Sequence, residues 1–149
     1  MKVKYNNLYV HFVFTTQDRF PSIEEVYRER IEKYITGIVN KCNCKMYAIY
    51  ANPEHVHFLV SRDPSVSENE LADTIGNASE NFINNNNLCK SNFRWQTSCS
   101  AFSISKKDID KVCKYILNQP EHHKIHTFAE EYDKFLKFYQ HTLSENKLG

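Results

Sequence analysis

Two histidines separated by one residue, His55 and His57, are the first candidates for chemistry in this sequence. The residues between and after them are apolar, which predicts a strand over 55–61. Because alternate residues of a strand point to the same face, both imidazoles would lie on one side of a sheet. Two imidazoles on one face can form half of a metal site. Taken alone, the pair slightly favours the alternative interpretation, one buried, hydrogen-bonded histidine and one surface histidine.

A tyrosine and a glutamine form a second candidate pair. Tyr115 and Gln119 lie four residues apart in a segment of helical periodicity, so they would share one helix face, one turn apart. A glutamine oxygen can complete a metal site begun by two histidines, and a tyrosine one turn away can reach a phosphate held on that metal. The alternative for this pair is a tyrosine that packs on the core and a glutamine near a helix end.

Secondary structure around these residues follows from hydrophobic periodicity. Strands are predicted over residues 9–15, 45–51, 55–61 and, as two extended pieces, 93–95 and 101–105. Helices are predicted over residues 23–41, 67–84, 107–118 and 127–139. Three of these helices begin at, or one residue after, a serine or threonine that has glutamate three positions later, the spacing of a capping box; the pairs are Ser22 with Glu25, Ser67 with Glu70, and Thr127 with Glu130. Ser105 is expected to cap the third helix, and Pro120 to end it.

The predicted order of elements is β-α-β-β-α-β-α-α. The short turn over 52–54 predicts a hairpin in the middle of the chain, so the sheet should be antiparallel with helices packed on it. The simplest such α+β architecture is a ferredoxin-like sandwich. No internal repeat or linker divides the sequence, which predicts a single domain over residues 1–149.

Composition restricts the class of protein. Hydrophobic residues make up 41% and charged residues 25% of the 149, which is typical of a soluble globular domain. The formal charge is only +1, from 19 basic and 18 acidic side chains, so a large basic face is not expected. No apolar run is long enough for a membrane span. The five cysteines, without a signal-peptide pattern, predict reduced thiols in a cytoplasm.

Six blocks of sequence occur in the order typical of one known family. The blocks are residues 15–21 (TTQDRFP), 52–60 (NPEHVHFLV), 93–96 (FRWQ), 101–105 (AFSIS), 115–123 (YILNQPEHH) and 127–132 (TFAEEY). Through them the chain resembles the IS200-like transposases, single-tyrosine members of the HUH (His-hydrophobic-His) endonuclease class that also includes the REP-associated tyrosine transposases. The resemblance extends over nearly the whole chain.

The resemblance implies a role for each candidate residue. His55 and His57 would be metal ligands with Gln119 as the third, and Tyr115 would be the nucleophile that forms a 5′-phosphotyrosine. The family implies Mg²⁺ or Mn²⁺; ligand type alone would also permit Zn²⁺ or Ni²⁺. The expected partners are single-stranded, hairpin-forming DNA and a second copy of the chain, in a bacterial cytoplasm. In this homodimer the tyrosine helix would serve the histidine pair of the partner.

Several further side chains are candidates for holding DNA. Arg19 and Arg94 could contact phosphate and Trp95 could stack on a base, as in single-strand binders, although Trp95 suits a core equally well. Lysines along the third helix could follow the DNA backbone or form a solvated face; they are Lys106, Lys107, Lys111 and Lys114. His122 and His123 match the family pattern, and histidines after a helix end are also commonly solvated.

The second helix departs from the family pattern, since residues 75–81 (IGNASEN) include Glu80 and no lysine. Ser98-Cys99-Ser100 also replaces the family's glycine-aromatic-glycine. The sequence therefore predicts a transposase or transposase-derived nickase, with two alternatives. One is a DNA-binding module of the same fold that has lost catalysis, and the other is a metal hydrolase of small phosphodiesters that uses His55 and His57 alone.

Overall fold

The computed structural model describes residues 1–121, 129–134 and 136–137, and the chain divides into two compact units, residues 1–117 and 118–149. The first unit contains four strands and three α-helices. The strands are β1 (Tyr9–Thr15), β2 (Lys45–Ala51), β3 (His55–Ser61) and β4 (Ser100–Ile104), and the helices are α1 (Arg28–Lys41), α2 (Glu68–Asn85) and α3 (Ile109–Leu117). Short 3₁₀ turns, η1 (Gln17–Arg19), η2 (Glu25–Tyr27) and η3 (Lys106–Asp108), precede α1 and α3.

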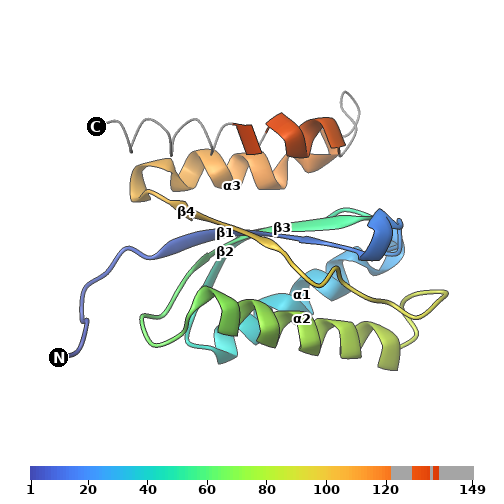
Figure 1. Ribbon diagram of the computed structural model, residues 1–149, viewed down its shortest axis with the longest axis horizontal. Helices are drawn as coiled ribbons and strands as arrows, with labels where there is room; N and C mark the ends of the chain where they lie inside the picture. The colour runs from blue at the N-terminus through green and yellow to red at the C-terminus, as the bar shows by residue number, and fades with distance from the viewer. Residues whose placement is uncertain (122–128, 135, 138–149) are drawn as a thin grey trace. The chain divides into compact units, whose positions relative to one another are not determined.

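The four strands form one antiparallel sheet in the order β2-β3-β1-β4. Helices α1 and α2 cover one face of this sheet and α3 lies on the other (Figure 1). This confirms the predicted α+β sandwich, and the strand order is that of the ferredoxin-like arrangement. Within the described residues, no helix is long and apolar enough to cross a membrane.

Residue alternation along the two central strands divides their side chains between the faces. Phe12 and Phe14 of β1 and Phe58 of β3 pack together, with ring centroids 5.1–6.2 Å apart. They belong to the main core together with residues of α1 and α2 such as Ile35 and Ile75. The intervening residues of both strands, which include both histidines of the candidate pair, therefore point to the face that carries α3.

Three strands occupy the predicted residues 9–15, 45–51 and 55–61. Helix α2 begins one residue after its predicted start, and its capping serine is confirmed, because Ser67 Oγ accepts a hydrogen bond from the Glu70 backbone N–H at 3.1 Å. The hydroxyl satisfies a backbone donor that the first turn of a helix cannot pair internally.

The predicted start of the first helix is wrong. Regular helix begins at Arg28, after the 3₁₀ turn at Glu25–Tyr27, and Ser22 caps nothing. The physical reason is a tertiary contact: the Ile23 N–H donates to Pro53 O at 3.0 Å and the Ile23 side chain is buried in the core. These contacts hold the segment extended, which prevents it from forming a first helical turn.

The predicted fourth strand and third helix also need correction. Residues 93–95 form only an isolated bridge between Thr16 and Trp95, and β4 begins at Ser100. Ser105 makes no side-chain cap; its carbonyl accepts from the Asp108 N–H, which produces a 3₁₀ turn before α3. Helix α3 ends at Leu117, and Asn118 forms a turn.

The second unit is described only in part. Residues 129–134 and 136–137 are helical, so part of the predicted fourth helix is present. Residues 119–121 are helical as well, so the prediction that Pro120 ends a helix is wrong. Its predicted first residue, Thr127, lies outside the described residues. Within this unit, Gln119 Nε2 donates a hydrogen bond to Glu131 Oε1 at 3.0 Å.

Candidate active site

Strand β3 positions the two histidines of the candidate pair. A tight turn precedes it, closed by a hydrogen bond from the Asn52 N–H to His55 O at 2.8 Å, so the strand begins at His55 itself. The His55 and His57 rings lie on the same face, with centroids 4.9 Å apart and planes at 78°. Both side chains are buried. The alternation of side chains along a strand predicted that the two rings would share one face, and in the structure they do.

Both ring nitrogens of His55 have polar neighbours. Nδ1 lies 2.9 Å from Glu54 Oε1, and Nε2 lies 3.2 Å from Asn52 Nδ2. An ionised carboxylate only accepts hydrogen bonds, so Nδ1 carries the proton and donates it to Glu54. Nε2 then has its lone pair exposed toward the Asn52 amide. This is the tautomer that a metal-ligating histidine requires when it binds through Nε2.

A third histidine, His11, contacts His57. His11 Nε2 lies 3.0 Å from His57 Nδ1, and both side chains are buried. His11 pairs with Leu59 across the β1–β3 ladder, so His57 is its diagonal neighbour, a separation that long side chains bridge. The sequence gives no sign of a role for His11, because its partner is 46 residues away and β1 shows only the pattern of a strand.

Helix α3 brings Tyr115 to the same face of the sheet. The helix packs on β2 and β3, and the Tyr115 ring lies 5.7 Å from the His57 ring of its own chain, edge to face at 86°. Tyr115 is half-buried. One chain therefore places the tyrosine, His57 and His55 side by side.

Gln119 belongs to the second unit. The prediction put it on the same helix as Tyr115, but α3 ends at Leu117, so the two residues are not on one uninterrupted helix. Its role as a metal ligand stays a prediction from the resemblance. His122 and His123 lie outside the described residues.

The donor chemistry of the histidine pair fits a divalent metal. Each imidazole has Nδ1 next to a side chain that can accept its proton, Glu54 for His55 and His11 for His57, so each would bind a metal through Nε2, which at His55 means displacing the Asn52 amide. Metal-ligating histidines commonly bond their second ring nitrogen to a carboxylate or another acceptor in this manner. Imidazole nitrogen suits Zn²⁺ and Ni²⁺, and added oxygen ligands would favour Mg²⁺ or Mn²⁺.

The lysines and arginines proposed to bind DNA are exposed. Lys107 of η3 and Lys111 and Lys114 of α3 are exposed, on the helix that carries Tyr115. Arg19 and Arg94 are also exposed. The Arg94 backbone is fixed next to the end of β1, because its carbonyl accepts from the Gln17 N–H at 2.9 Å.

Trp95 is held by core contacts. Its ring lies 5.4 Å from Phe14 and 4.8 Å from Phe93, edge to face in both pairs, and its indole N–H donates to Ser79 Oγ at 2.9 Å. These are the contacts of a core residue, which was one of the two roles that the sequence allowed for Trp95. Stacking of Trp95 on a base stays a prediction.

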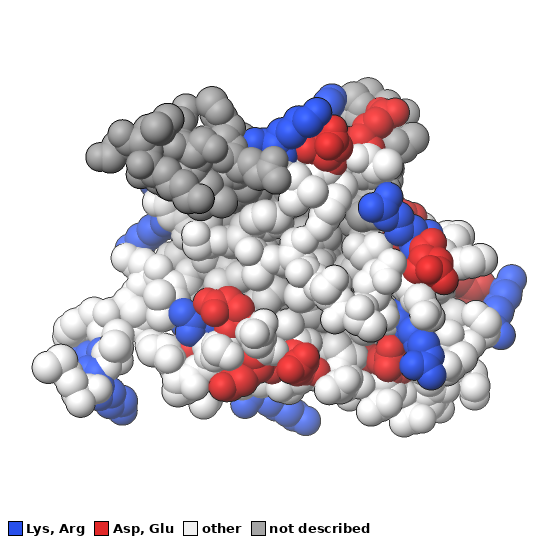
Figure 2. All heavy atoms as spheres, in the orientation of Figure 1, with Lys and Arg blue, Asp and Glu red and all other residues white. Residues whose placement is uncertain are grey.

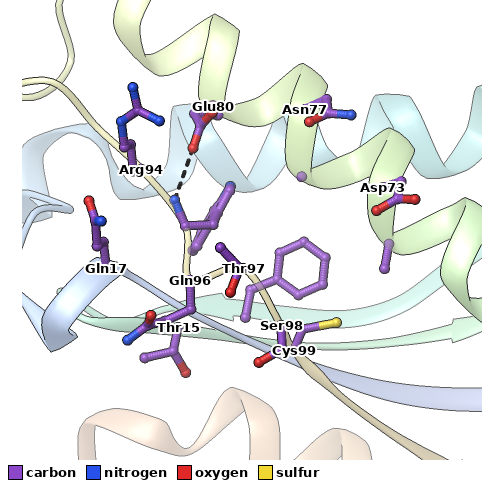
Figure 3. Close-up of a pocket in the computed structure, with 14 residues that line it drawn as sticks. Thr15, Gln17, Asp73, Asn77, Glu80, Arg94, Gln96, Thr97, Ser98 and Cys99 are labelled. Carbon is purple, nitrogen blue, oxygen red and sulfur yellow. Dashed lines mark hydrogen bonds between the residues drawn. The ribbon is translucent and has the colours of Figure 1, made fainter.

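A pocket of about 300 Å³ lies between α2 and the segment 94–99. Figure 3 shows Asp73, Asn77 and Glu80 of α2 on one side of it and Arg94 and Cys99 on the other. Glu80 Oε1 accepts from the Trp95 backbone N–H at 3.0 Å. Burial, with a contribution from the Asp73 charge, raises the pKa of the Cys99 thiol.

Helix α2 gives this side of the molecule an acidic character. Its 18 residues include Glu68, Glu70, Asp73 and Glu80 and neither lysine nor arginine. Figure 2 shows acidic side chains gathered over α2. Because a phosphate would be repelled there, the α2 face is a poor path for a DNA backbone, whereas exposed lysines lie on the α3 face.

Comparison with known proteins identifies relatives. The family model described as "Transposase IS200 like" matches residues 4–119. A crystal structure from Deinococcus radiodurans R1, described as that of a transposase, matches with a TM-score of 0.63 at 18% identity, covering 80% of this chain and 98% of that chain. The structure of a REP-associated tyrosine transposase bound to a REP hairpin matches with a TM-score of 0.61 at 17% identity, covering 83% and 72%. At these identities the two structures establish a shared fold. No curated protein sequence matches the chain significantly.

Proposed function

Because the chain belongs to the IS200-like transposase family, we propose that it cleaves and rejoins single-stranded DNA through Tyr115 with the help of a divalent metal. The observation that carries the proposal is the position of Tyr115, with its ring 5.7 Å from His57 and beside the buried histidine pair. Packing of α3 on the sheet does not by itself require a tyrosine beside two histidines that point to the α3 face. A nucleophile that attacks a phosphate held on a metal must lie close to the ligands of that metal.

His55 and His57 would hold the metal through Nε2, and the resemblance supplies Gln119 as a third ligand. When bound, Mg²⁺ or Mn²⁺ polarises the scissile phosphate and stabilises the charge of the in-line transition state. The protein's contribution is to hold the two imidazoles in the required tautomer and to place them under α3. Burial of both rings excludes water that would otherwise compete for the ligand nitrogens.

Tyr115 supplies the nucleophilic oxygen. The phenol oxygen forms a bond to phosphorus while the bond from phosphorus to the 3′-oxygen breaks. The tyrosine proton is lost in this step and the 3′-oxygen gains one, so the products are a 5′-phosphotyrosine and a 3′-hydroxyl. The phosphotyrosine keeps the energy of the broken bond, and attack by a 3′-hydroxyl reverses the step and joins strands without ATP.

Hairpin-forming single-stranded DNA is the proposed substrate. The REP-associated transposase of similar fold is bound to such a hairpin, which supports this class of partner. The exposed lysines of η3 and α3 flank the tyrosine, while α2 repels phosphate, so we place the strand that is cleaved on the α3 face. Few phosphate contacts are expected, in accord with a net charge of +1.

The resemblance also implies a homodimer in which the tyrosine helix acts on the partner's histidines. The contact between Tyr115 and His57 of one chain supports a site that a single chain can assemble. Exchange of α3 between two copies would produce the same neighbours in the dimer. Mixed variants separate these arrangements, as discussed below.

One alternative has its own support in the structure. A DNA-binding module of this fold that no longer cleaves would be consistent with the acidic α2, where the sequence departs from the family pattern. It does not explain the contact between Tyr115 and His57.

The test uses hairpin single-stranded DNA from the flanks of the gene, incubated with the protein and Mn²⁺. We expect a covalent protein–DNA adduct that disappears in Tyr115→Phe and persists in Tyr34→Phe, a matched control on α1 whose ring stacks on Phe82. Binding without any adduct would favour the non-catalytic module. Cleavage that survives in Tyr115→Phe would favour a phosphodiester hydrolase that uses the histidines alone.

A further inference from the structure

We infer that His11 and Glu54 are positioning residues of the histidine pair, each fixing one imidazole with Nδ1 protonated and Nε2 turned toward a shared metal. The inference rests on the proposed function, since it concerns the ligands of that site. It adds two residues, one of them on a different strand, that neither the His-x-His pattern nor the tyrosine helix indicates.

Glu54 acts on His55. Its carboxylate oxygen lies 2.9 Å from His55 Nδ1, and the side chain of His55 is buried while that of Glu54 is 19% exposed. The backbone of Glu54 is held as well, because its carbonyl accepts from the Thr16 N–H at 2.9 Å and from Thr16 Oγ1 at 3.1 Å. The backbone of Glu54 is therefore fixed next to the residue that follows β1, and the carboxylate reaches His55 Nδ1 from that fixed position. An acceptor at Nδ1 selects one tautomer of His55.

His11 acts on His57, and here the tautomers of two rings are coupled. Between His11 Nε2 and His57 Nδ1 there is one hydrogen, so one ring donates and the other accepts. If His57 is to bind a metal through Nε2, its proton must be on Nδ1, and it donates to His11. His11 must then be neutral with its own proton on Nδ1.

A role limited to filling the core would not require this arrangement. A buried phenylalanine would fill the space of His11, and β1 already places phenylalanines at positions 12 and 14 on its other face. Instead, the His11 imidazole lies 3.0 Å from His57 Nδ1, the ring nitrogen that would not bind the metal. Glu54 stands at the same nitrogen of His55. Two unlike side chains from different segments thus make the same contact on the two candidate ligands.

The experiment compares histidine tautomers in the metal-free protein with Mn²⁺ affinity. Nuclear magnetic resonance of protein labelled with ¹⁵N-histidine reports which ring nitrogen carries the proton, and calorimetric titration with Mn²⁺ alone gives affinity. The variants are His11→Phe, which keeps a ring but removes the acceptor, His11→Gln, whose oxygen can accept near the position of Nε2, and Glu54→Ala with Glu54→Gln. Val13→Ala, a buried change on the same face of β1, is the structural control.

We expect His55 and His57 of the wild type to carry their protons on Nδ1. His11→Phe should move His57 to a mixture of tautomers and weaken Mn²⁺ binding about 10- to 100-fold, the usual loss on removal of such a partner. His11→Gln should restore most of the affinity, and Val13→Ala should change neither readout. Glu54→Ala should act on the His55 tautomer in the same way, with rescue by Glu54→Gln.

The inference is overturned by a wild-type His57 protonated on Nε2, or by equal Mn²⁺ affinity in the wild type and His11→Phe. An equal loss in Val13→Ala would also overturn it, because the effect would then be one of packing. A wild type that binds no Mn²⁺ would be a different failure, that of the proposed metal site, and it is seen before any variant is compared.

Discussion

The Tyr115 ring stands edge to face against the His57 ring of the same chain, with centroids 5.7 Å apart. The tyrosine comes from a helix that follows the four-stranded sheet, and the histidine from a central strand of that sheet. The proposed nucleophile and one proposed metal ligand are therefore neighbours before any second copy of the chain is considered. Variants can therefore test whether one chain or two chains form the site.

Mixing two inactive variants distinguishes assembly within one chain from assembly across a dimer. In a mixture of His57→Ala and Tyr115→Phe, exchange of α3 between chains would rebuild one intact site in each mixed dimer. Assembly within one chain rebuilds none. From the contact seen here we expect no recovery of adduct formation above that of the separate variants. Recovery on mixing would show the partner-serving arrangement that the family resemblance implies.

The lysines of α3 should govern the salt dependence of DNA binding. Each contact with a phosphate of single-stranded DNA contributes roughly 0.7 to the slope of log affinity against log salt concentration. We expect Lys111→Ala and Lys114→Ala each to lower that slope by about this amount, in titrations of a labelled hairpin at several salt concentrations. Lys33→Ala, an exposed change on α1 across the sheet, should leave the slope unchanged. A slope altered by Lys33 and not by the α3 lysines would place the DNA on the other face.

Asn52 should compete with the metal for His55. Its amide Nδ2 lies 3.2 Å from His55 Nε2, the nitrogen that would bind the ion, so this hydrogen bond must be lost on metal binding. A hydrogen bond of this kind has a net value of about 0.5–1.5 kcal/mol. Asn52→Ala should therefore tighten Mn²⁺ binding by roughly 2- to 10-fold, as measured by calorimetry. Weaker binding in this variant would show that Asn52 instead supports the site.

The carboxyl of Glu32 should make stability depend on pH in mildly acidic solution. Burial raises the pKa of Glu32, an effect opposed by the hydrogen bond from the Ala51 N–H at 2.9 Å and by Arg28. Because the folded-state pKa is above the unfolded one, the folded state holds the proton more tightly. The free energy of unfolding should then fall as pH rises from the ordinary carboxyl pKa through the raised one. Urea unfolding between pH 4 and 7 should show a shallower fall in Glu32→Gln.

The sequence could predict those parts of the fold that depend on neighbouring residues. Strand β3 has its predicted bounds because the turn over 52–54 ends one strand and the alternation begins at once at His55. Ser67 caps α2 because a cap needs only the backbone three residues later. The start of α1 could not be predicted, since Ile23 is held extended by the carbonyl of Pro53, 30 positions further along the chain.

The candidate site likewise has parts that follow from neighbouring residues and parts that depend on distant ones. The strand period was sufficient to predict that His55 and His57 share a face. That Tyr115 meets them depends on how α3 packs on β2 and β3, which came from the family resemblance and not from local pattern. His11 depends on the register between β1 and β3, which pairs His11 with Leu59 and so places it diagonal to His57. No pattern within β1 distinguishes it from a buried strand histidine. The ligand role of Gln119 stays a prediction.

The alternation along β1 and β3 has a further consequence for how this protein can lose activity. The phenylalanines that hold α1 and α2 to the sheet are on one face, and the histidines contacted by Tyr115 are on the other. Substitution of Tyr115, which is half-buried and outside the main core, therefore leaves that core untouched, so we expect the disabled protein to fold. Such a protein would keep the exposed lysines of α3 and compete with active copies for the same DNA. Under the proposed function, such a loss-of-function allele would inhibit its active relatives in the same cell.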